Sequence, residues 1–121
     1  MRIIITNNPM VRDKQCVSSS KERIEFYETD YLGVLKAVRD RIHMGHSLVT
    51  HPLSGSVKTG ETPYKTVIIT GEKAALDVNS LSLIEKSMET CEKLMASAVK
   101  KEWNEKVSSD FKLIDYNLIF S

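Results

Sequence analysis

One polar segment lies near the middle of the chain, and the rest of the sequence is read outward from it. It runs His51-Pro52-Leu53-Ser54-Gly55-Ser56-Val57-Lys58-Thr59-Gly60-Glu61-Thr62-Pro63-Tyr64. Short apolar runs of the kind that form strands flank it, at residues 47–50 and 66–70. Long polar loops between strands often carry binding residues. The segment is therefore the first candidate for a functional loop.

The composition indicates a single globular domain over residues 1–121. Hydrophobic residues make up 41% of the chain and charged residues 27%, which is typical of a folded domain of this length. The net charge of +1 gives no general attraction to nucleic acid or acidic lipid, and no apolar run is long enough to span a membrane. No signal peptide is recognisable, and the two cysteines form no metal or redox motif. We expect a cytoplasmic protein.

The pattern of apolar residues predicts about five strands. An isoleucine-rich run and a valine-isoleucine run are typical of buried strands, and three segments alternate or are shorter. The expected strands are Arg2–Thr6, Arg23–Glu28, His46–Thr50, Lys65–Thr70 and Asp110–Phe120.

Helical spacing of apolar residues predicts two main helices. The first runs from Tyr31 to about Met44, with Asp30 as its N-cap and Gly45 as its terminator. The second begins after Asn79 or Ser80 and continues to about residue 103. A helical turn is expected near residues 11–15. The fold class is α/β: a single domain with a mostly parallel or mixed sheet of about five strands and helices packed on it. The order strand, helix, strand over residues 23–50 favours parallel pairing.

Two strand ends carry the candidate ligand-binding residues. In open α/β sheets, ligands bind outside the carboxyl ends of strands, which here are Thr6-Asn7-Asn8 and Thr50-His51-Pro52. If the two strands are parallel and close, these segments converge. Glycine, hydroxyl and lysine side chains farther along the loop favour a small anion. The candidates are Thr6, Asn7, Asn8, His51, Ser54, Gly55, Ser56, Lys58, Glu61, Thr62 and Tyr64.

A nucleotide-binding loop, a metal site and a serine nucleophile each fit this loop poorly. Residues 55–60 begin like a nucleotide P-loop, but Glu61 stands where the phosphate-binding lysine belongs and a strand follows where a helix is needed. His46 and His51 would point to opposite faces of a strand, so no shared metal is expected. No nucleophile elbow surrounds Ser54 or Ser56. We therefore expect no cofactor and no metal, and assign no catalytic residue.

Three stretches of the sequence together resemble the GrdX family. They are Ile5-Thr6-Asn7-Asn8-Pro9, the run from Arg39 to His46, and the loop strings His51-Pro52-Leu53-Ser54-Gly55-Ser56-Val57-Lys58 and Glu61-Thr62-Pro63-Tyr64-Lys65. The resemblance covers most of the chain and is most specific over residues 43–65. It implies a protein encoded beside the glycine, sarcosine and betaine reductases of amino-acid fermentation. It implies no particular activity, so no catalytic role is carried over.

Three hypotheses follow for the function. The leading one is an accessory protein of such a reductase system that binds a small anionic ligand or a partner through residues 6–9 and 51–64. A second is a small metabolite enzyme that uses His51 as general acid or base. A third is a structural assembly factor for a reductase subunit. An open sheet edge would also make a homodimer easy to form.

Overall fold

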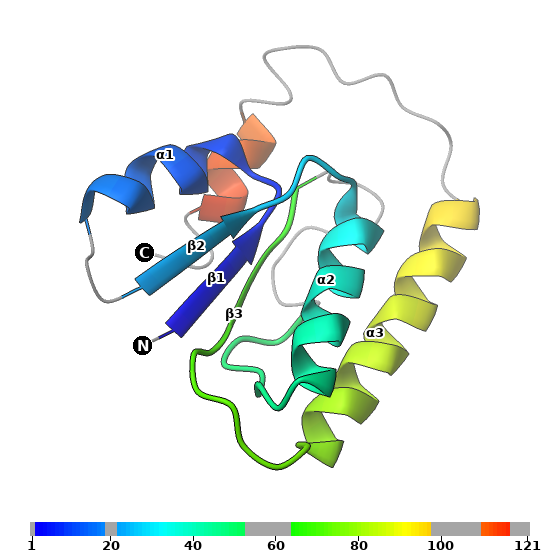
Figure 1. The fold of residues 1–121 in the computed structure, drawn as a ribbon. Helices are drawn as coiled ribbons and strands as arrows, with labels where there is room; N and C mark the ends of the chain where they lie inside the picture. Colours follow the sequence, from blue (N-terminus) through cyan, green and yellow to red (C-terminus); the bar gives the residue numbers. More distant parts are fainter. Residues whose placement is uncertain (1, 19–21, 53–63, 98–109, 117–121) are drawn as a thin grey trace.

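The computed structural model describes residues 2–18, 22–52, 64–97 and 110–116. In chain order its main elements are β1 (Arg2–Thr6), α1 (Pro9–Ser18), β2 (Glu22–Phe26), α2 (Tyr31–His43), β3 (Thr66–Thr70) and α3 (Val78–Ser97). Residues 110–116 form a further short helix. Figure 1 shows the three strands side by side, with α2 and α3 running along one flank.

The described strands form one mixed sheet in the order β2-β1-β3. The β1 and β2 strands are parallel, with Ile4 beside Ile24, and α1 connects them. The β3 strand is antiparallel to β1 and places Ile68 beside Ile4. The prediction of a small α/β fold with helices packed on a sheet is thus correct, but the predicted sheet of about five strands is wrong, because the described residues form three.

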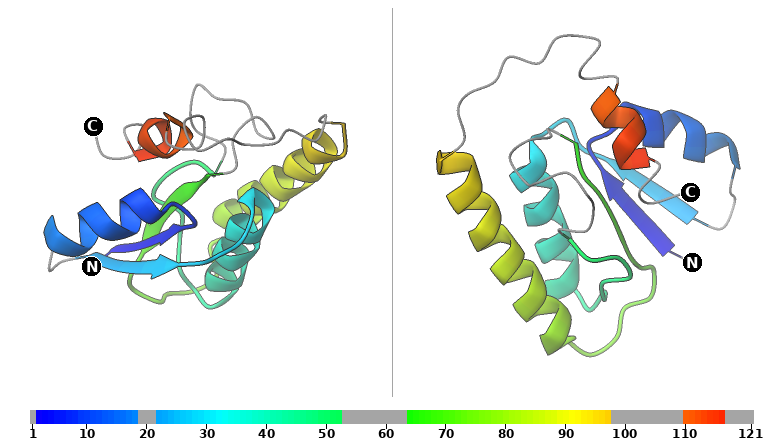
Figure 2. Two further views of the ribbon diagram at one scale, coloured as in Figure 1. Left: turned by 90° about the horizontal axis from the view of Figure 1, so that it is seen from above. Right: turned by 180° about the vertical axis from the view of Figure 1, so that it is seen from behind.

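Helices cover both faces of the sheet, as the view from above in Figure 2 shows. On one face, Ile3 and Ile5 of β1 join a core with the buried residues of α2 and α3. On the other face, Ile4, Val11 and Ile68 form a smaller cluster, against which Ile24 and Tyr116 pack. Successive residues of a strand point to opposite faces, so the unbroken isoleucine run of β1 feeds both cores.

Two predicted strands are wrong. The segment His46–Thr50 makes only one antiparallel bridge, from Leu48 to Ile69. The expected parallel unit over residues 23–50 is therefore absent, and the described parallel pair is β1 with β2. The segment Asp110–Phe120 is helical over residues 110–116, and its remainder lies outside the described residues.

The backbone explains why residues 47–50 are not a regular strand. The amides of Val49 and Thr50 both donate to one carbonyl, that of Ile68, at 2.9 and 3.2 Å. A regular ladder would give each amide its own acceptor on alternate residues. The Thr50 hydroxyl then accepts from the Ile68 amide at 3.0 Å, in place of a backbone carbonyl. This bulge-like contact covers the outer edge of β3 without adding a full strand.

The two predicted helices are present, with one change of cap. Asp30 caps α2 by accepting a hydrogen bond from the Gly33 amide at 2.8 Å, and Gly45 follows the helix with a φ of 108°. The α3 helix begins earlier than predicted, because Asp77 is its cap and accepts from the amides of Asn79 and Ser80. These hydrogen bonds, first of all those from Ser80, lower the pKa of Asp77.

Candidate functional site

The carboxyl end of β1 lies beside the amino end of β3, where residues 51–64 lead into the sheet. Thr6 pairs with Thr66 in the register of the two strands. The Asn7 side chain accepts from the Lys65 amide at 2.8 Å and donates to the Thr29 carbonyl at 2.9 Å. The predicted convergence of Thr6-Asn7-Asn8 with Thr50-His51-Pro52 stays a prediction, and the residues that meet at this end of the sheet are 6–7 and 65–66. They meet through antiparallel pairing of β1 with β3, and a parallel third strand is not involved.

Asn8 joins this strand end to two helices. Its side-chain oxygen accepts from the Met10 amide at 3.0 Å, which makes Asn8 the N-cap of α1, with Pro9 in the favoured first position. Its side-chain nitrogen donates to the Lys112 carbonyl and to the Asp115 carboxylate, each at 2.9 Å. Asn8 is fully buried. It therefore anchors the 110–116 helix at the carboxyl end of β1.

A directed chain of hydrogen bonds runs through the buried threonines to Asp115. Thr66 donates its hydroxyl proton to Asp115 Oδ2 at 2.7 Å. The Thr6 hydroxyl lies 2.8 Å from the Thr66 hydroxyl and accepts from the Asn8 amide at 3.0 Å. Because the Thr66 proton points to Asp115, the Thr6 hydroxyl is left to donate to Thr66. Each hydroxyl in this series therefore donates toward Asp115, and the series ends on a single carboxylate oxygen.

Asp115 and Lys65 are two buried groups of opposite charge at this site. Burial raises the pKa of Asp115, while the hydrogen bonds from Asn8 and Thr66 and the nearby Lys65 ammonium act in the opposite direction. Burial lowers the pKa of Lys65 to about 8, and attraction to Asp115 opposes that shift. Lys65 is 3% exposed. Both shifts have one physical cause, which is the loss of water around a charge.

Aromatic rings flank the two lysines at this end of the sheet. The Lys65 ammonium lies 5.8 Å from the centre of the Tyr31 ring, and the Lys112 ammonium lies 5.7 Å from that of Tyr64. Both distances fit a cation–π contact. The Tyr31 hydroxyl also reaches the Pro52 carbonyl at 3.5 Å, a long contact at the start of the 51–64 segment.

The structure places five of the predicted ligand-binding residues. Thr6, Asn7 and Asn8 are buried at the strand end, Tyr64 is partly buried beside Lys112, and His51 is exposed at the start of the loop. The other candidates lie outside the described residues; they are Ser54, Gly55, Ser56, Lys58, Glu61 and Thr62.

Sequence reasoning missed three residues of this site, namely Lys65, Thr66 and Asp115. Lys65 was predicted as the start of a strand and the end of a family-like string, and Asp115 as part of a strand, but neither was named as a ligand-binding candidate. A lysine directly before a buried run, and a lone carboxylate within the apolar stretch at residues 113–116, were the available signals. Polar side chains inside apolar stretches are buried only with partners, so each of them indicates a site.

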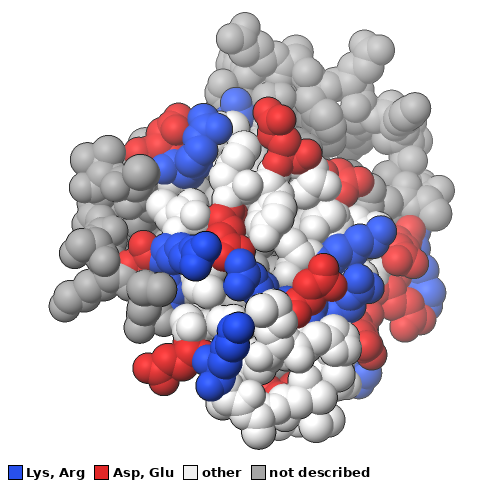
Figure 3. All heavy atoms as spheres, viewed as in Figure 1, with Lys and Arg blue, Asp and Glu red and all other residues white. Residues whose placement is uncertain are grey.

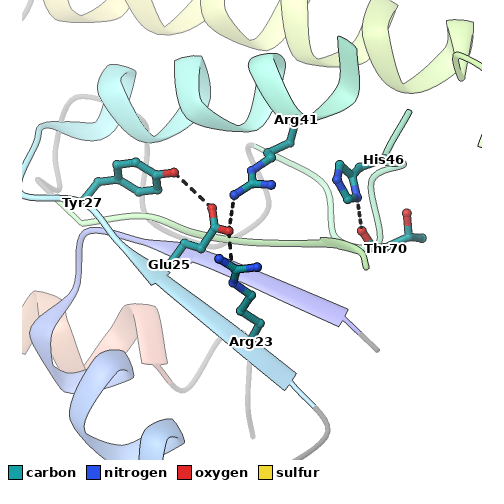
Figure 4. Close-up of polar contacts among 6 residues, drawn as sticks. All are labelled: Arg23, Glu25, Tyr27, Arg41, His46 and Thr70. Atoms are coloured by element: carbon teal, nitrogen blue, oxygen red, sulfur yellow. Dashed lines mark hydrogen bonds and ion pairs between the residues drawn. The ribbon is translucent and has the colours of Figure 1, made fainter. Parts of the chain in front are cut away.

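A second polar cluster lies between β2 and α2 and is drawn in Figure 4. Its centre is Glu25, which binds the Arg41 guanidinium, lies 3.6 Å from Arg23 and accepts from the Tyr27 hydroxyl at 3.1 Å. Burial, followed by the bond to Glu25, raises the pKa of Tyr27. The hydrogen bond to Glu25 likewise raises the pKa of Arg41. The cluster ties the edge strand to α2 and contains no residue that the sequence singled out as a candidate.

The three histidines are far from equivalent in their surroundings. His46 is buried, and its Nδ1 lies 2.7 Å from the Thr70 carbonyl, so Nδ1 carries the proton and Nε2 is left without a described partner (Figure 4). His43 and His51 are exposed. Among the described residues, no three His, Cys, Asp or Glu side chains come together as metal ligands would.

The arrangement at the carboxyl end of β1 brings charged groups together in a buried environment. A buried ammonium, a buried carboxylate and oriented hydroxyl and amide donors are the parts of a polar binding site. Within the described segments, no helix is both long and apolar enough to cross a bilayer.

Comparison with known proteins gives one result. No curated protein and no solved structure matches the chain. A family model described as GrdX-like protein matches residues 3–121, which is nearly the whole length. That match includes both the strand end at residues 6–8 and the 51–64 segment. The chain belongs to the GrdX-like protein family.

Proposed function

We propose that this protein is an accessory protein of a glycine, sarcosine or betaine reductase system and binds a small anionic ligand. The ligand would lie where the carboxyl end of β1 meets the 51–64 segment. Membership in the GrdX-like family supports the association with such a system. The observation that carries the ligand proposal is the burial of the Lys65 ammonium, one residue after that segment in the sequence.

Lys65 favours an anion for an energetic reason. Burial of the ammonium lowers the pKa of Lys65 to about 8, and attraction to Asp115 opposes that shift. A carboxylate, sulfate or phosphate group close to Lys65 would favour the charged ammonium in the same way as Asp115. Lys112 adds a second cation at the same end of the sheet. In this proposal Ser54, Ser56 and Lys58 supply further donors from the loop, while Thr6, Asn7 and Asn8 hold the floor of the site.

A thermal-shift titration tests the proposal. The purified protein would be titrated with phosphate, sulfate, acetyl phosphate, glycine, sarcosine and betaine at constant ionic strength. A ligand present at a hundred times its Kd stabilises the folded state by about 2.7 kcal/mol, which gives a clear rise in Tm. We expect that rise with at least one anion, and expect it to be lost in Lys65→Met and reduced in Ser56→Ala.

Lys36→Met is the matched control, because Lys36 is exposed on α2, away from the site. It should keep the full rise in Tm. An equal rise in Lys65→Met would show that the anion acts elsewhere, and no rise with any compound would overturn the ligand proposal.

A second candidate is docking onto a reductase subunit, and an apolar surface favours it. Among the described residues, Met44, Val49, Leu76 and Val78 are large, apolar and exposed, and they come from two neighbouring segments. The Ala74 amide donates to the Gly45 carbonyl at 3.0 Å, which holds the two segments together. In Figure 3 the corresponding lower end of the molecule is largely free of Lys, Arg, Asp and Glu. Exposed apolar patches often mark protein-binding sites.

Affinity capture distinguishes this second candidate from ligand binding. The tagged protein would be incubated with purified reductase subunits. Docking through the apolar surface predicts that capture survives Lys65→Met and fails in the double variant Val49→Asp, Val78→Asp. Loss of capture in Lys65→Met alone would instead connect the partner to the anion site.

A further inference from the structure

Within the described residues, the outer edge of β2 has backbone groups without partners at alternate residues. The Tyr27 amide donates to the Thr6 carbonyl of β1, at 2.9 Å. Residues that share its orientation, Arg23 and Glu25, therefore also turn their backbone groups to β1. The backbone groups of Glu22, Ile24 and Phe26 face away from the sheet, and no described segment pairs with them.

The two edges of the sheet differ in this respect. Residues 47–50 hydrogen-bond to the outer side of β3, through Thr70 and Ile68. The β2 strand is the described edge without such a cover, and Figure 1 shows it at the outer margin of the sheet. It has no proline and no bulge in its register with β1. Glu22, Arg23 and Glu25 are charged, so this edge favours a partner strand whose charges are complementary.

We infer that β2 is a homodimer interface, in which the β2 strands of two copies pair antiparallel about a twofold axis at Ile24. In this register Ile24 lies opposite Ile24 of the second copy, and Glu22 lies opposite Phe26 of the second copy. All the outward-facing backbone groups of the strand then find partners. The sheet of the dimer is continuous across the two copies.

Charge supports the same register. It places Arg23 opposite Glu25 of the second copy, and by symmetry Glu25 opposite Arg23. These are non-hydrogen-bonded pairs of the ladder, in which side chains come closest. The Arg23 side chain is 62% exposed and already turned to the face that carries Glu25. Opposite charges in such pairs stabilise a sheet.

Neighbouring registers are less favourable both for the backbone hydrogen bonds and for the charges of the facing side chains. An axis at Arg23 would face that residue with its own copy, and an axis at Glu25 would bring two carboxylates together. Either axis would also require backbone groups that already bind β1. The axis at Ile24 is the one that satisfies the free backbone groups and the charges together, so a second copy of this chain is the partner that fits the edge.

Sedimentation equilibrium across a wide range of protein concentration tests the inference. We expect a reversible dimer in the wild type. Arg23→Glu turns two attractive pairs into two repulsive ones, and we expect its dimer dissociation constant to rise by about tenfold or more. Lys36→Glu makes the same change of charge on the exposed surface of α2 and should leave the constant unchanged.

Disulfide trapping gives a second measurement that does not depend on the charge change. In a Cys16→Ser background, Ile24→Cys should form a covalent dimer under mild oxidation, because facing Cα atoms of a hydrogen-bonded pair lie about 5.5 Å apart, within disulfide range. Lys36→Cys is the control and should not. A monomer at every concentration, an equal effect of Arg23→Glu and Lys36→Glu, or no preferential trapping at residue 24 would overturn the inference.

Discussion

The side chain of Lys65 is 3% exposed, and burial lowers its pKa from 10.5 to about 8. The folded-state pKa lies below the unfolded value, so between about pH 8 and 10.5 the unfolded chain binds more protons than the folded one. Stability rises with pH wherever this holds. The Lys65 contribution to the free energy of unfolding should therefore increase across this window, by about 2–4 kcal/mol in total.

Urea unfolding at several pH values measures this effect in the variant Lys65→Met. The free energy of unfolding of the variant minus that of the wild type should fall as the pH rises from 8 to 10.5. Lys36→Met, at an exposed position, serves as control and should follow the wild type. If the free energies of unfolding of Lys65→Met and the wild type changed with pH in parallel, the lowered pKa of Lys65 in the folded state would be contradicted.

Asp115 accepts two buried hydrogen bonds on one oxygen, from Asn8 and Thr66. Asp115→Ala leaves both donors without an acceptor, and we expect the free energy of unfolding to fall by about 2–4 kcal/mol. Asp115→Asn keeps a carbonyl oxygen in the same place and removes a buried charge, so it should cost clearly less. Denaturant unfolding of the two variants at neutral pH gives the comparison. Equal losses of unfolding free energy in the two variants would mean that the hydrogen bonds to Asp115 do not account for its contribution to stability.

At the level of elements, the end of α2 depends on one glycine. Gly45 has a φ of 108°, and a Cβ there would lie 2.4 Å from the Ala74 carbonyl oxygen. Gly45→Ala should therefore lower the free energy of unfolding by at least about 2 kcal/mol. Gly33→Ala is the matched comparison within α2. Its Cβ would lie 2.8 Å from the Thr29 Cβ, so the exposed residue Thr29 must shift, while the helix gains up to about 1 kcal/mol of propensity.

Thermal unfolding of both glycine variants tests this difference. Gly45→Ala should lower Tm by several degrees, and Gly33→Ala should lower it clearly less, because Gly33 has an ordinary helical φ and Thr29 is exposed. Similar Tm values for the two would contradict the close approach of α2 to the β3–α3 connection.

Local signals predicted the elements whose cause is local. Asp30, the apolar stripe of α2 and Gly45 all lie within one helix and its caps, and each was predicted in its observed role. The segment 110–116 was predicted as a strand because Leu113 and Ile114 supply apolar content. In the structure both are among the exposed side chains, and the helix is held by polar contacts of residues 112 and 115 with Asn8. Contacts across about a hundred residues leave no periodic pattern to read.

The same reasoning explains how much of the candidate site could be predicted. Thr6, Asn7 and Asn8 were found because a strand end is visible in sequence as a buried run followed by turn residues. Lys65 and Asp115 were not, because their proximity depends on antiparallel pairing of β1 with β3 and on the docking of a distant helix. The sequence showed an apolar run at residues 66–70 but gave no sign of its direction relative to β1.

For the molecule as a whole, the sheet separates two cores of unequal size, and adjacent residues of β1 lie in different cores. Ile5 lies in the cluster shared with α2 and α3, and Ile4 lies in the small cluster with Val11 and Ile68. Both side chains are fully buried. Removing buried methylenes costs more where the surroundings cannot collapse into the space. Ile5→Ala should therefore lower the free energy of unfolding by about 3–5 kcal/mol and Ile4→Ala by about 2–3 kcal/mol.

Native-state hydrogen exchange extends this comparison from total stability to its distribution. Ile4→Ala loosens the layer formed by α1 and the 110–116 helix, so amides there should exchange faster while those of α2 keep most of their protection. Ile5→Ala lies under the large core and should lower protection in α2, α3 and the sheet together. Because the two residues are neighbours on one strand with the same chemistry, a different pattern of exchange can only come from the face each one occupies. A uniform loss of protection in both variants would show that the two layers unfold as one unit.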